Sequence, residues 1–339
     1  MLTQAQLAQR LGVDRSTVSL CFNQPQRVKV ATRQRVLQTA RELGYRPNAA
    51  ARATKRGSFQ AVGLLQTTHK FHGYLPTPLL EGIQDALAEH DLAFMLAKLP
   101  DAELSQTADP PRILAERMVD GLLVNYTHHA PPALSPMLHD AGVPAVWINT
   151  KRAEDCVYPD NLDAARRLTQ HLLDLGHRRV GYLPAHLAAV DPDGHFSHLD
   201  RLAGYQRAMQ HAGLPPRVIT TDRDDDRARH ERLRAAFTGP DACTALIVYF
   251  SGFAPLVLDV ARDLDLRLGP DLSLATFALQ DNNHLFGGTI MVPPHHELGR
   301  AAVRMLHRRL GPAAGDEPAP PVVLPYRLHA GHSTQPPPA

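Results

Sequence analysis

Cysteine is scarce in this sequence, and long apolar runs are missing. Only Cys21, Cys156 and Cys243 occur among 339 residues, and their odd number and wide spacing are typical of reduced thiols in a cytoplasm. No run of about 18 apolar residues is present, which excludes a membrane-spanning helix. The first residues lack a charged region followed by an apolar stretch, so we expect no secretory signal. Apolar residues still make up 44% of the chain, which is enough for packed cores.

Sequence signatures of catalysis and of cofactor binding are also missing. There is no Gly-x-Gly-x-x-Gly and no P-loop, so nucleotide-cofactor chemistry is not indicated. A Gly-x-Ser-x-Gly elbow is absent, and Cys156 has no histidine at a recognisable spacing. The 19 histidines, particularly His195 and His198, suggest a metal site, but no cysteine or second histidine pair completes one. We therefore expect no catalytic residues, no cofactor and no metal.

Acidic residues are almost missing from the first 58 positions. This segment has eleven Lys and Arg against Asp14 and Glu42, a charge of +9, so the other 281 residues carry −7 of the total of +2. A short basic module on a mildly acidic body indicates a polyanionic partner for the module alone. The alternative is an arginine-rich surface that only contacts solvent.

The same segment contains the boundary signals of short helices. Thr3 and Gln6 are spaced as a capping box at the start of a helix that Gly12 ends. Asp14 is placed to cap a second helix over 15–22. Two short helices joined by a glycine-containing turn predict a helix-turn-helix motif.

A third predicted helix over 31–43 completes a three-helix domain. In such a domain the second helix enters the major groove of DNA, and its first turn meets base edges. Arg15 and Ser16 lead that helix, and Arg15 can form a bidentate contact with guanine. Short side chains suited to phosphate contacts are Thr17, Ser19, Asn23 and Thr32. A three-helix protein-binding module is the alternative, and the charge of the segment and its polar face argue against it.

The residues of this segment resemble the headpiece of the lactose repressor (LacI/GalR) family. The motifs are Leu2-Thr3-x3-Leu7-Ala8-x2-Leu11-Gly12-Val13-x3-Thr17-Val18-Ser19-x3-Asn23, Val28-x3-Thr32-Arg33-x2-Val36-Leu37 and Glu42-Leu43-Gly44-Tyr45-x-Pro47-Asn48-x2-Ala51-Arg52. The resemblance implies a helix-turn-helix domain over 1–45 and a hinge helix within 46–58 that folds in the minor groove when two subunits meet on DNA. Further DNA-contact positions implied by the resemblance are Thr3, Lys29, Tyr45, Asn48, Ala51 and Lys55.

Two positions depart from the family pattern. Family members usually carry a leucine in the hinge helix that wedges between base pairs, where this chain has Thr54. The recognition helix usually has an arginine where this chain has Leu20, which offers an apolar contact and no bidentate hydrogen bond. The operator sequence and its bending therefore do not transfer from relatives.

Beyond residue 58 the sequence alternates between short apolar runs and helical segments. Strands are predicted over 61–65, 92–97, 121–125, 145–149, 179–183, 245–249 and 272–277, and helices over 77–89, 131–141, 162–175, 202–211 and 254–264. This alternation predicts parallel sheets with ligands bound at the carboxyl ends of the strands.

The family resemblance continues through this body. The motifs are Val119-Asp120-Gly121-Leu122-Leu123-Val124, Asp160-Asn161-x3-Ala165, His171-Leu172-x3-Gly176-His177-Arg178-Arg179-Val180, Arg201-x2-Gly204-Tyr205-x2-Ala208 and Glu297-Leu298-Gly299-Arg300-x-Ala302. The resemblance implies an all-α headpiece followed by an α/β core over 59–330, with two Rossmann-like lobes similar to periplasmic sugar-binding proteins. The first lobe is expected over 59–159 and 286–320, the second over 160–285 and 321–330, and a disordered tail over 331–339.

Effector-binding positions follow from the same resemblance. Arg201 is the first candidate, because a guanidinium can fork onto a carboxylate or a pair of hydroxyls. The other expected positions are Thr67, Phe71, Tyr74, Asn125, Tyr126 and Asn149. The family usually has Asn-Asp after the strand over 245–249 and an aspartate after the strand over 272–277, where this chain has Phe250-Ser251 and Ala278. With two acidic residues missing, an ordinary free sugar is less expected. The alternatives are a modified or larger sugar, an aromatic or acidic metabolite, or no small effector at all.

Together these features predict a homodimeric regulator that binds a double-stranded DNA operator in the bacterial cytoplasm, most often as a repressor, under control of a small-molecule effector. The rival interpretation is a solute-binding protein, which would need an export signal and no basic headpiece. An enzyme would need a catalytic set, and none is visible.

Overall fold

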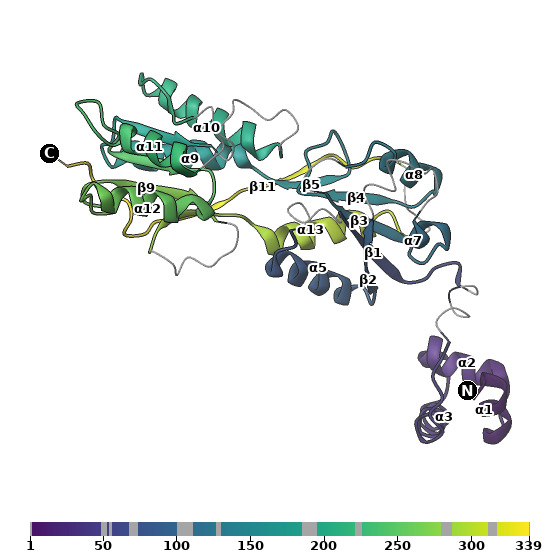
Figure 1. The fold of residues 1–339 in the computed structure, drawn as a ribbon. Coiled ribbons are helices and arrows are strands. Elements are labelled where there is room, and N and C mark those ends of the chain that lie inside the picture. Colours follow the sequence, from purple (N-terminus) through teal and green to yellow (C-terminus); the bar gives the residue numbers. More distant parts are fainter. Residues whose placement is uncertain are drawn as a thin grey trace. The chain divides into compact units, whose positions relative to one another are not determined.

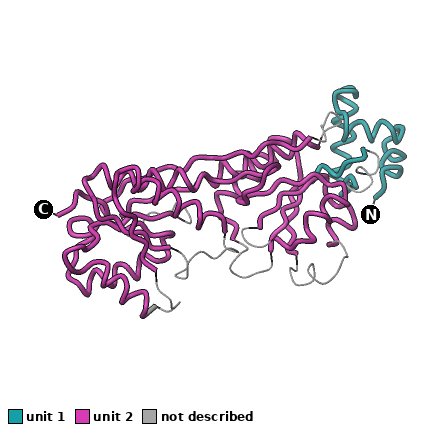
Figure 2. The backbone as a smooth tube through the Cα atoms, turned by 90° about the horizontal axis from the view of Figure 1, so that it is seen from above, with its two compact units in different colours: residues 1–60 teal, residues 61–339 magenta. Residues whose placement is uncertain are grey.

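The computed structural model describes residues 2–48, 53, 56–67, 74–99, 111–126, 130–184, 195–220, 226–278, 287–310 and 317–338. These residues divide into two compact units, 1–60 and 61–339, which Figure 2 shows in teal and magenta. Each unit is described by itself below. In the described segments no helix is long and apolar enough to cross a membrane.

The first unit is helical, as predicted. Its elements are α1 (Gln4–Leu11), α2 (Arg15–Asn23), the short 3-10 helix η1 (Pro25–Arg27) and α3 (Val30–Glu42). The capping box is confirmed, since Thr3 Oγ1 accepts from the Gln6 amide at 3.3 Å and the Thr3 amide donates to Gln6 Oε1 at 2.9 Å. Gly12 ends α1 at φ +65°, a conformation that favours glycine. Buried side chains from all three helices, including Leu7, Val18 and Val36, form one small core.

Two details of this unit differ from the prediction. Asp14 occupies the N-cap position of α2, but its side chain makes no capping hydrogen bond. The third helix begins at Val30, one residue earlier than expected, with Lys29 at its N-cap. In the hinge segment Ala53 and Arg56 are helical, and the Gly57 amide donates to the Ala53 carbonyl at 2.8 Å. The remaining hinge positions 49–52 and 54–55 lie outside the described residues.

The second unit contains two six-stranded sheets, each the centre of a lobe (Figure 1). The first lobe has the sheet order β11-β5-β4-β3-β1-β2, with β1 (Ala61–Thr67), β2 (Ala93–Leu99), β3 (Gly121–Asn125), β4 (Ala145–Ile148), β5 (Cys156–Pro159) and β11 (Val322–Leu324). The second lobe has the order β12-β10-β9-β8-β6-β7, with β6 (Val180–Leu183), β7 (Arg217–Val218), β8 (Ala245–Val248), β9 (Ser273–Phe277), β10 (Thr289–Val292) and β12 (Arg327–His329). Every pairing is parallel except that of β10 with β12.

Helices cover both sheets through apolar faces. The first lobe has α5 (Thr77–Glu89), α7 (Arg112–Ala115), α8 (Leu134–Asp140) and α13 (His295–His307), and the second has α9 (Asn161–Asp174), α10 (Ser197–His211), α11 (Asp226–Ala236) and α12 (Ala254–Asp263). Figure 1 shows α5 and α13 side by side, and they share one apolar core. Glycines allow this close approach, because a Cβ at Gly82 would meet the His296 carbonyl oxygen at 2.0 Å.

The chain crosses between the lobes three times, and two of the crossings differ from the prediction. The first follows β5 near residue 160, as expected. The second lies between β10 and α13, not near 286, because β10 pairs with β9 in the second lobe. The third lies between β11 and β12, not near 321, because β11 pairs with β5 in the first lobe.

The predicted disordered tail over 331–339 is wrong for residues 331–338. The Leu274 amide donates to the Ser333 carbonyl at 2.8 Å, and the Ser333 hydroxyl donates to the Leu274 carbonyl at 2.6 Å. The Gln335 carbonyl accepts from His177 Nε2 at 2.8 Å, and Ser333 and Thr334 are buried. The tail is ordered because its backbone groups find partners on the second lobe.

Candidate DNA-binding and effector-binding sites

The outer face of α2 carries the predicted base-reading residues. Arg15 and Ser16 are exposed in its first turn, while Val18 is fully buried on the opposite face. Arg15 Nε lies 3.5 Å from Gln4 Oε1, a weak contact that a DNA base can replace. Four other residues of α2 that were predicted to contact DNA are half-buried: Thr17, Ser19, Leu20 and Asn23.

Asn23 already has partners inside α2. Its amide nitrogen donates to the Ser19 carbonyl at 3.0 Å and lies 3.2 Å from Ser19 Oγ. These bonds hold the end of α2. They use only the amide nitrogen of Asn23, so its Oδ1 still accepts hydrogen bonds, and this oxygen lies 3.4 Å from Arg56 Nη2. Asn23 therefore has a structural role in addition to the predicted phosphate contact.

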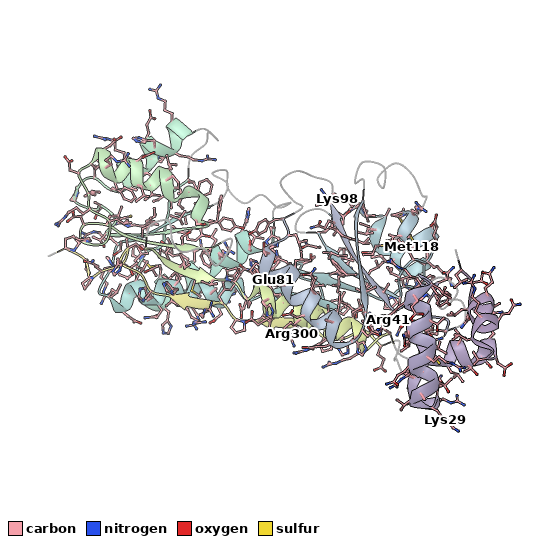
Figure 3. All side chains as sticks on the ribbon, turned by 90° about the horizontal axis from the view of Figure 1, so that it is seen from below. Lys29, Arg41, Glu81, Lys98, Met118 and Arg300 are labelled. Atoms are coloured by element: carbon pink, nitrogen blue, oxygen red, sulfur yellow. The ribbon has the colours of Figure 1, made fainter. Side chains whose placement is uncertain are left out.

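The start of α3 presents a second set of predicted contacts. Lys29 is exposed at the N-cap and Thr32 is half-buried in the first turn. Figure 3 labels Lys29 and Arg41 at opposite ends of this helix. Between Lys29 and Thr32, Val30 is 59% exposed, a large apolar side chain on the surface that the sequence interpretation did not select.

The positions that follow α3 are described only in part. Tyr45 packs its ring against Phe22 with centroids 5.6 Å apart, and Asn48 is exposed. The hinge positions Ala51, Thr54 and Lys55 lie outside the described residues, so their predicted DNA contacts stay predictions.

In the second unit Arg201 lies at the centre of a polar network. Its side chain is on the buried face of α10, with 8% of the residue exposed. Nε donates to Asn161 Oδ1 at 2.8 Å, Nη1 to the Tyr249 carbonyl at 2.7 Å and Nη2 to the Tyr326 hydroxyl at 3.0 Å. The guanidinium also lies over the Phe277 ring, 4.1 Å from its centroid.

These partners come from distant parts of the chain. Asn161 begins α9 after the first crossing, Tyr326 lies in the third crossing, and Tyr249 follows β8. Burial by itself lowers the pKa of Arg201, but the phenolic oxygens of Tyr326 and Tyr249 outweigh it and the pKa is raised. The guanidinium is therefore charged at neutral pH.

Asn149 lies at the end of β4 in a left-handed conformation, φ +55°. Its carbonyl accepts from His195 Nε2 at 2.9 Å, so this nitrogen carries the ring proton. In neutral His195 the other nitrogen, Nδ1, accepts from the Ser197 hydroxyl at 2.7 Å, and Ser197 Oγ lies 2.6 Å from the Tyr249 hydroxyl. This chain of bonds joins β4 of the first lobe to α10 and β8 of the second. The sequence interpretation considered His195 only as a metal ligand and missed Ser197.

The other first-lobe candidates gather where β1 and β3 end. Thr67 and Asn125 are buried at the carboxyl ends of these neighbouring parallel strands. The Asn125 side chain donates to the Tyr74 carbonyl at 3.1 Å, and the Tyr126 carbonyl accepts from the Thr150 hydroxyl at 2.7 Å. The structure thus brings four predicted positions together at one sheet edge, while Phe71 lies outside the described residues.

The second-lobe candidates also follow strands. Phe250 and Ser251 come after β8, and Ala278 comes directly after β9. Phe250 packs edge-on against Phe253 at 4.6 Å between centroids, and Phe277 is the ring beneath Arg201. This edge is apolar and, at these predicted positions, carries no carboxylate.

His295 is a neighbour of this network that sequence reasoning missed. It begins α13 after the second crossing, and burial together with the positive charge of Arg201 lowers its pKa to about 4. It is therefore neutral at pH 7. A groove of about 680 Å³ is lined by His295, Tyr326 and Arg167, among other residues of both lobes, and does not include Arg201. In the part of the chain that the structure describes, no three His, Cys, Asp or Glu side chains are grouped to hold a metal ion.

A helix-turn-helix unit with exposed polar and basic residues on its second helix, joined to a body of two parallel-sheet lobes, defines a DNA-binding regulator with a binding-protein-like body. Family models agree with this class. Residues 5–48 match the bacterial regulatory proteins of the lacI family, residues 66–246 match the periplasmic binding proteins and sugar binding domain of the LacI family, and residues 169–334 match the periplasmic binding protein-like domain. The chain belongs to the LacI family of bacterial regulatory proteins.

Individual relatives span nearly the whole chain. The chain is 30% identical over 348 residues to the HTH-type transcriptional regulator PtxS of Pseudomonas aeruginosa, covering 99% of this chain and 96% of that protein. It is 26% identical to the HTH-type transcriptional regulator IpsA of Corynebacterium glutamicum, covering 84% and 83% of the two chains.

Solved structures show the same fold. A complex of the transcriptional regulator CelR with cellobiose has 26% identity and a TM-score of 0.63, and the match covers 98% of this chain and 100% of that one. The lac repressor dimer bound to operator and the anti-inducer ONPF has 20% identity and a TM-score of 0.77, over 98% and 99% of the two chains. The predicted fold class and family are thereby confirmed.

Proposed function

We propose that this regulator binds operator DNA as a homodimer through α2 and α3, and that a small molecule held around Arg201 controls the binding. The exposed Arg15 and Ser16 on α2 support base reading, and Lys29 and Thr32 at the start of α3 support phosphate contacts. Two half-sites on the operator require two headpieces, which is why the functional form is a dimer.

The observation that carries the effector proposal is the network around Arg201. One side chain contacts residues from the first crossing, the third crossing and the end of β8. A ligand that binds at Arg201 with different affinities for two lobe arrangements must shift the equilibrium between them. Such a shift changes the spacing of the two hinge segments in the dimer, and with it the affinity for DNA.

The experiment begins with selection of an operator from a random DNA pool, using the full-length protein. Fluorescence anisotropy then measures binding of the selected DNA while metabolites are added. Arg201→Ala is expected to bind the operator as the unchanged protein does and to lose the response to the metabolite. A variant that still responds would remove Arg201 from the effector site.

The remaining parts of the proposal concern activity and place in the cell. We propose that the protein acts by binding alone, without catalysing a reaction, and that it works on DNA in the bacterial cytoplasm. The family it belongs to consists of transcriptional regulators, which supports both statements. Purified protein incubated with the effector should return the compound chemically unchanged, as measured by mass spectrometry.

A further inference from the structure

Among the described residues, Arg201 is a buried cation without a carboxylate partner. Its three hydrogen-bond acceptors in the described residues are an amide oxygen, a backbone carbonyl and a phenol, and none of them is a carboxylate. A buried charge that lacks a counterion carries a large desolvation penalty. The rings of Phe277 and Tyr249, 4.1 and 4.7 Å from the guanidinium carbon, offset only part of it.

The acidic residues next in sequence to Arg201 and to its partner Asn161 have other partners. Asp200 pairs with Lys151 at 2.9 Å, and Asp160 caps α9 by accepting from the Asp163 amide at 2.9 Å. At the predicted effector positions after β8 and β9 the residues are Phe250, Ser251 and Ala278, which supply no carboxylate. The described surroundings of Arg201 therefore contain a positive charge and no acid to balance it.

The guanidinium also has donors to spare. Arginine has five N–H groups, and three of them are used by Asn161, Tyr249 and Tyr326. One N–H on each terminal nitrogen is left without an acceptor in the described residues. The two oxygens of a carboxylate or a pair of hydroxyls can accept from two such N–H groups, and of these ligands only the carboxylate also brings a negative charge.

We propose that the effector carries a carboxylate, and that Arg201 is the residue that pairs with it. The inference rests on the proposed function, since it names the class of ligand for the same site. A carboxylate supplies the missing counterion and accepts both spare N–H groups. The apolar edge formed by Phe250 and Phe253 would then contact the uncharged part of the ligand.

The test compares matched pairs of neutral and acidic compounds by thermal unfolding of the full-length protein at equal ionic strength. The pairs are glycerol and glycerate, xylose and xylonate, and galactose and galacturonate, with sodium chloride and inorganic phosphate as reference solutes. A ligand that binds only the folded state raises the unfolding midpoint. We expect at least one carboxylate to raise it while its neutral partner does not. The proposal is overturned if a neutral compound or phosphate is the stronger stabiliser, or if no carboxylate exceeds chloride.

Two variants separate charge from folding. Arg201→Gln should weaken binding of the carboxylate roughly tenfold to a hundredfold, the loss of a charge-assisted contact. Asn161→Asp keeps Arg201 and places a carboxylate where Oδ1 now lies 2.8 Å from Nε, so Arg201 gains an internal counterion. This variant should fold and also lose its preference for acids over neutral partners. An unchanged preference in Asn161→Asp would contradict the proposal even if Arg201→Gln failed to fold.

Arg166→Gln is the matched control. Arg166 also lies on α9, but it is exposed, pairs with Asp163 at 2.6 Å and does not line the groove beside Tyr326. It should bind the carboxylate as the unchanged protein does. Fluorescence anisotropy on operator DNA distinguishes the ligand-class proposal from the regulatory proposal. If a neutral compound releases the protein from DNA, and this release requires Arg201, the regulatory function stands and only the ligand class is refuted. Carboxylate binding without any effect on DNA refutes the regulatory role and leaves the ligand class standing.

Discussion

The hydroxyl of Tyr326 donates a hydrogen bond of 2.9 Å to Oδ1 of Asn161, a residue 165 positions earlier in the chain. Asn161 follows the first crossing between the lobes, and Tyr326 lies in the third. Arg201 donates to both of them, so one buried triangle of side chains joins α10 to two of the three crossings. Any change in the angle between the lobes must therefore be compatible with these bonds or break them.

Tyr326→Phe should destabilise the second unit and weaken the response to effector. The change removes the hydroxyl that accepts from Arg201 Nη2 and donates to Asn161 Oδ1, so both buried groups lose a hydrogen-bond partner. The expected loss in the free energy of unfolding is about 1–3 kcal/mol. Urea unfolding followed by circular dichroism measures it. Tyr158→Phe is the control, because its half-buried ring contacts Phe196 edge-on and no other described residue forms a hydrogen bond with its hydroxyl. Equal losses in the two variants would refute the role of the triangle.

Arg15→Ala should change which bases are preferred at one position of the operator. Arg15 is exposed in the first turn of α2, where a bidentate contact to guanine is worth about 1–3 kcal/mol of discrimination. Selection from a random DNA pool, repeated with the variant, measures the change. Arg10→Ala removes the same charge from the exposed end of α1 and should keep the base preference. If both variants select the same sequence as the unchanged protein, Arg15 does not read bases.

Lys29→Ala should weaken binding to all DNA sequences alike. Lys29 is exposed at the N-cap of α3, and a phosphate contact at this position releases about one counterion. The slope of log affinity against log salt concentration should therefore fall in size by about one. Lys98→Ala, on β2 of the other unit, is the control and should leave the slope as it is. A sequence-dependent loss in Lys29→Ala would instead indicate base contact.

The headpiece could be predicted closely because its signals are local. Thr3 with Gln6 and the stop at Gly12 lie within one helix, and the structure has this capping box. The helices that these signals delimit bring Leu7, Val18 and Val36 together in one buried core. Asp14 is the exception, since a capping residue type at the N-cap position does not guarantee the bond.

The crossings were harder to predict because their strands are short. β10, β11 and β12 have three or four residues each, and β11 and β12 are separated only by Pro325 and Tyr326. Runs of this length carry no periodicity, so the sheet that each one joins depends on pairing partners far away in sequence. The tail over 331–338 was missed for the same reason, as its bonds go to Leu274 and His177.

The candidate effector site was chosen through its family motif and not through its chemistry. The motif selected Arg201, but Asn161 and Tyr326 were not chosen, since neutral residues 40 and 125 positions away carry no sequence signal of a contact with it. His295 was not selected from the sequence as a site residue. Its burial and its closeness to Arg201 arise only in the tertiary structure.

Gly82→Ala should destabilise the first lobe. A Cβ at Gly82 would lie 2.0 Å from the His296 carbonyl oxygen, which belongs to the backbone of α13 and cannot rotate away. The helices must separate, at a cost of about 1–3 kcal/mol. Gly213→Ala is the comparison, since its Cβ meets nothing within 4 Å and only the backbone at φ +70° is strained. Chemical unfolding should show a larger loss for Gly82→Ala, and the reverse order would contradict the close approach of α5 and α13.

Acid should destabilise the second lobe through His177. This ring lies 2.9 Å from Thr244 Oγ1 and 3.0 Å from Ser273 Oγ and donates to the Gln335 carbonyl, and burial is the main cause of its lowered pKa. In the unfolded chain the same group titrates near about 6.5. Below that pH the unfolded state binds a proton that the folded state does not, so stability falls as the pH is lowered toward the folded pKa. Above about 6.5 the contribution is complete.

The measurement is the free energy of unfolding by urea at a series of pH values from neutral to mildly acidic. His177→Gln should lower stability at neutral pH, because Thr244, Ser273 and Gln335 lose the imidazole, and should flatten the dependence on pH. Part of the slope should persist, since burial also lowers the pKa of His171 and His295. His211→Gln, at the exposed end of α10, is the control and should keep the full slope. A slope in His177→Gln as steep as in the unchanged protein would exclude His177 as a source of the acid sensitivity.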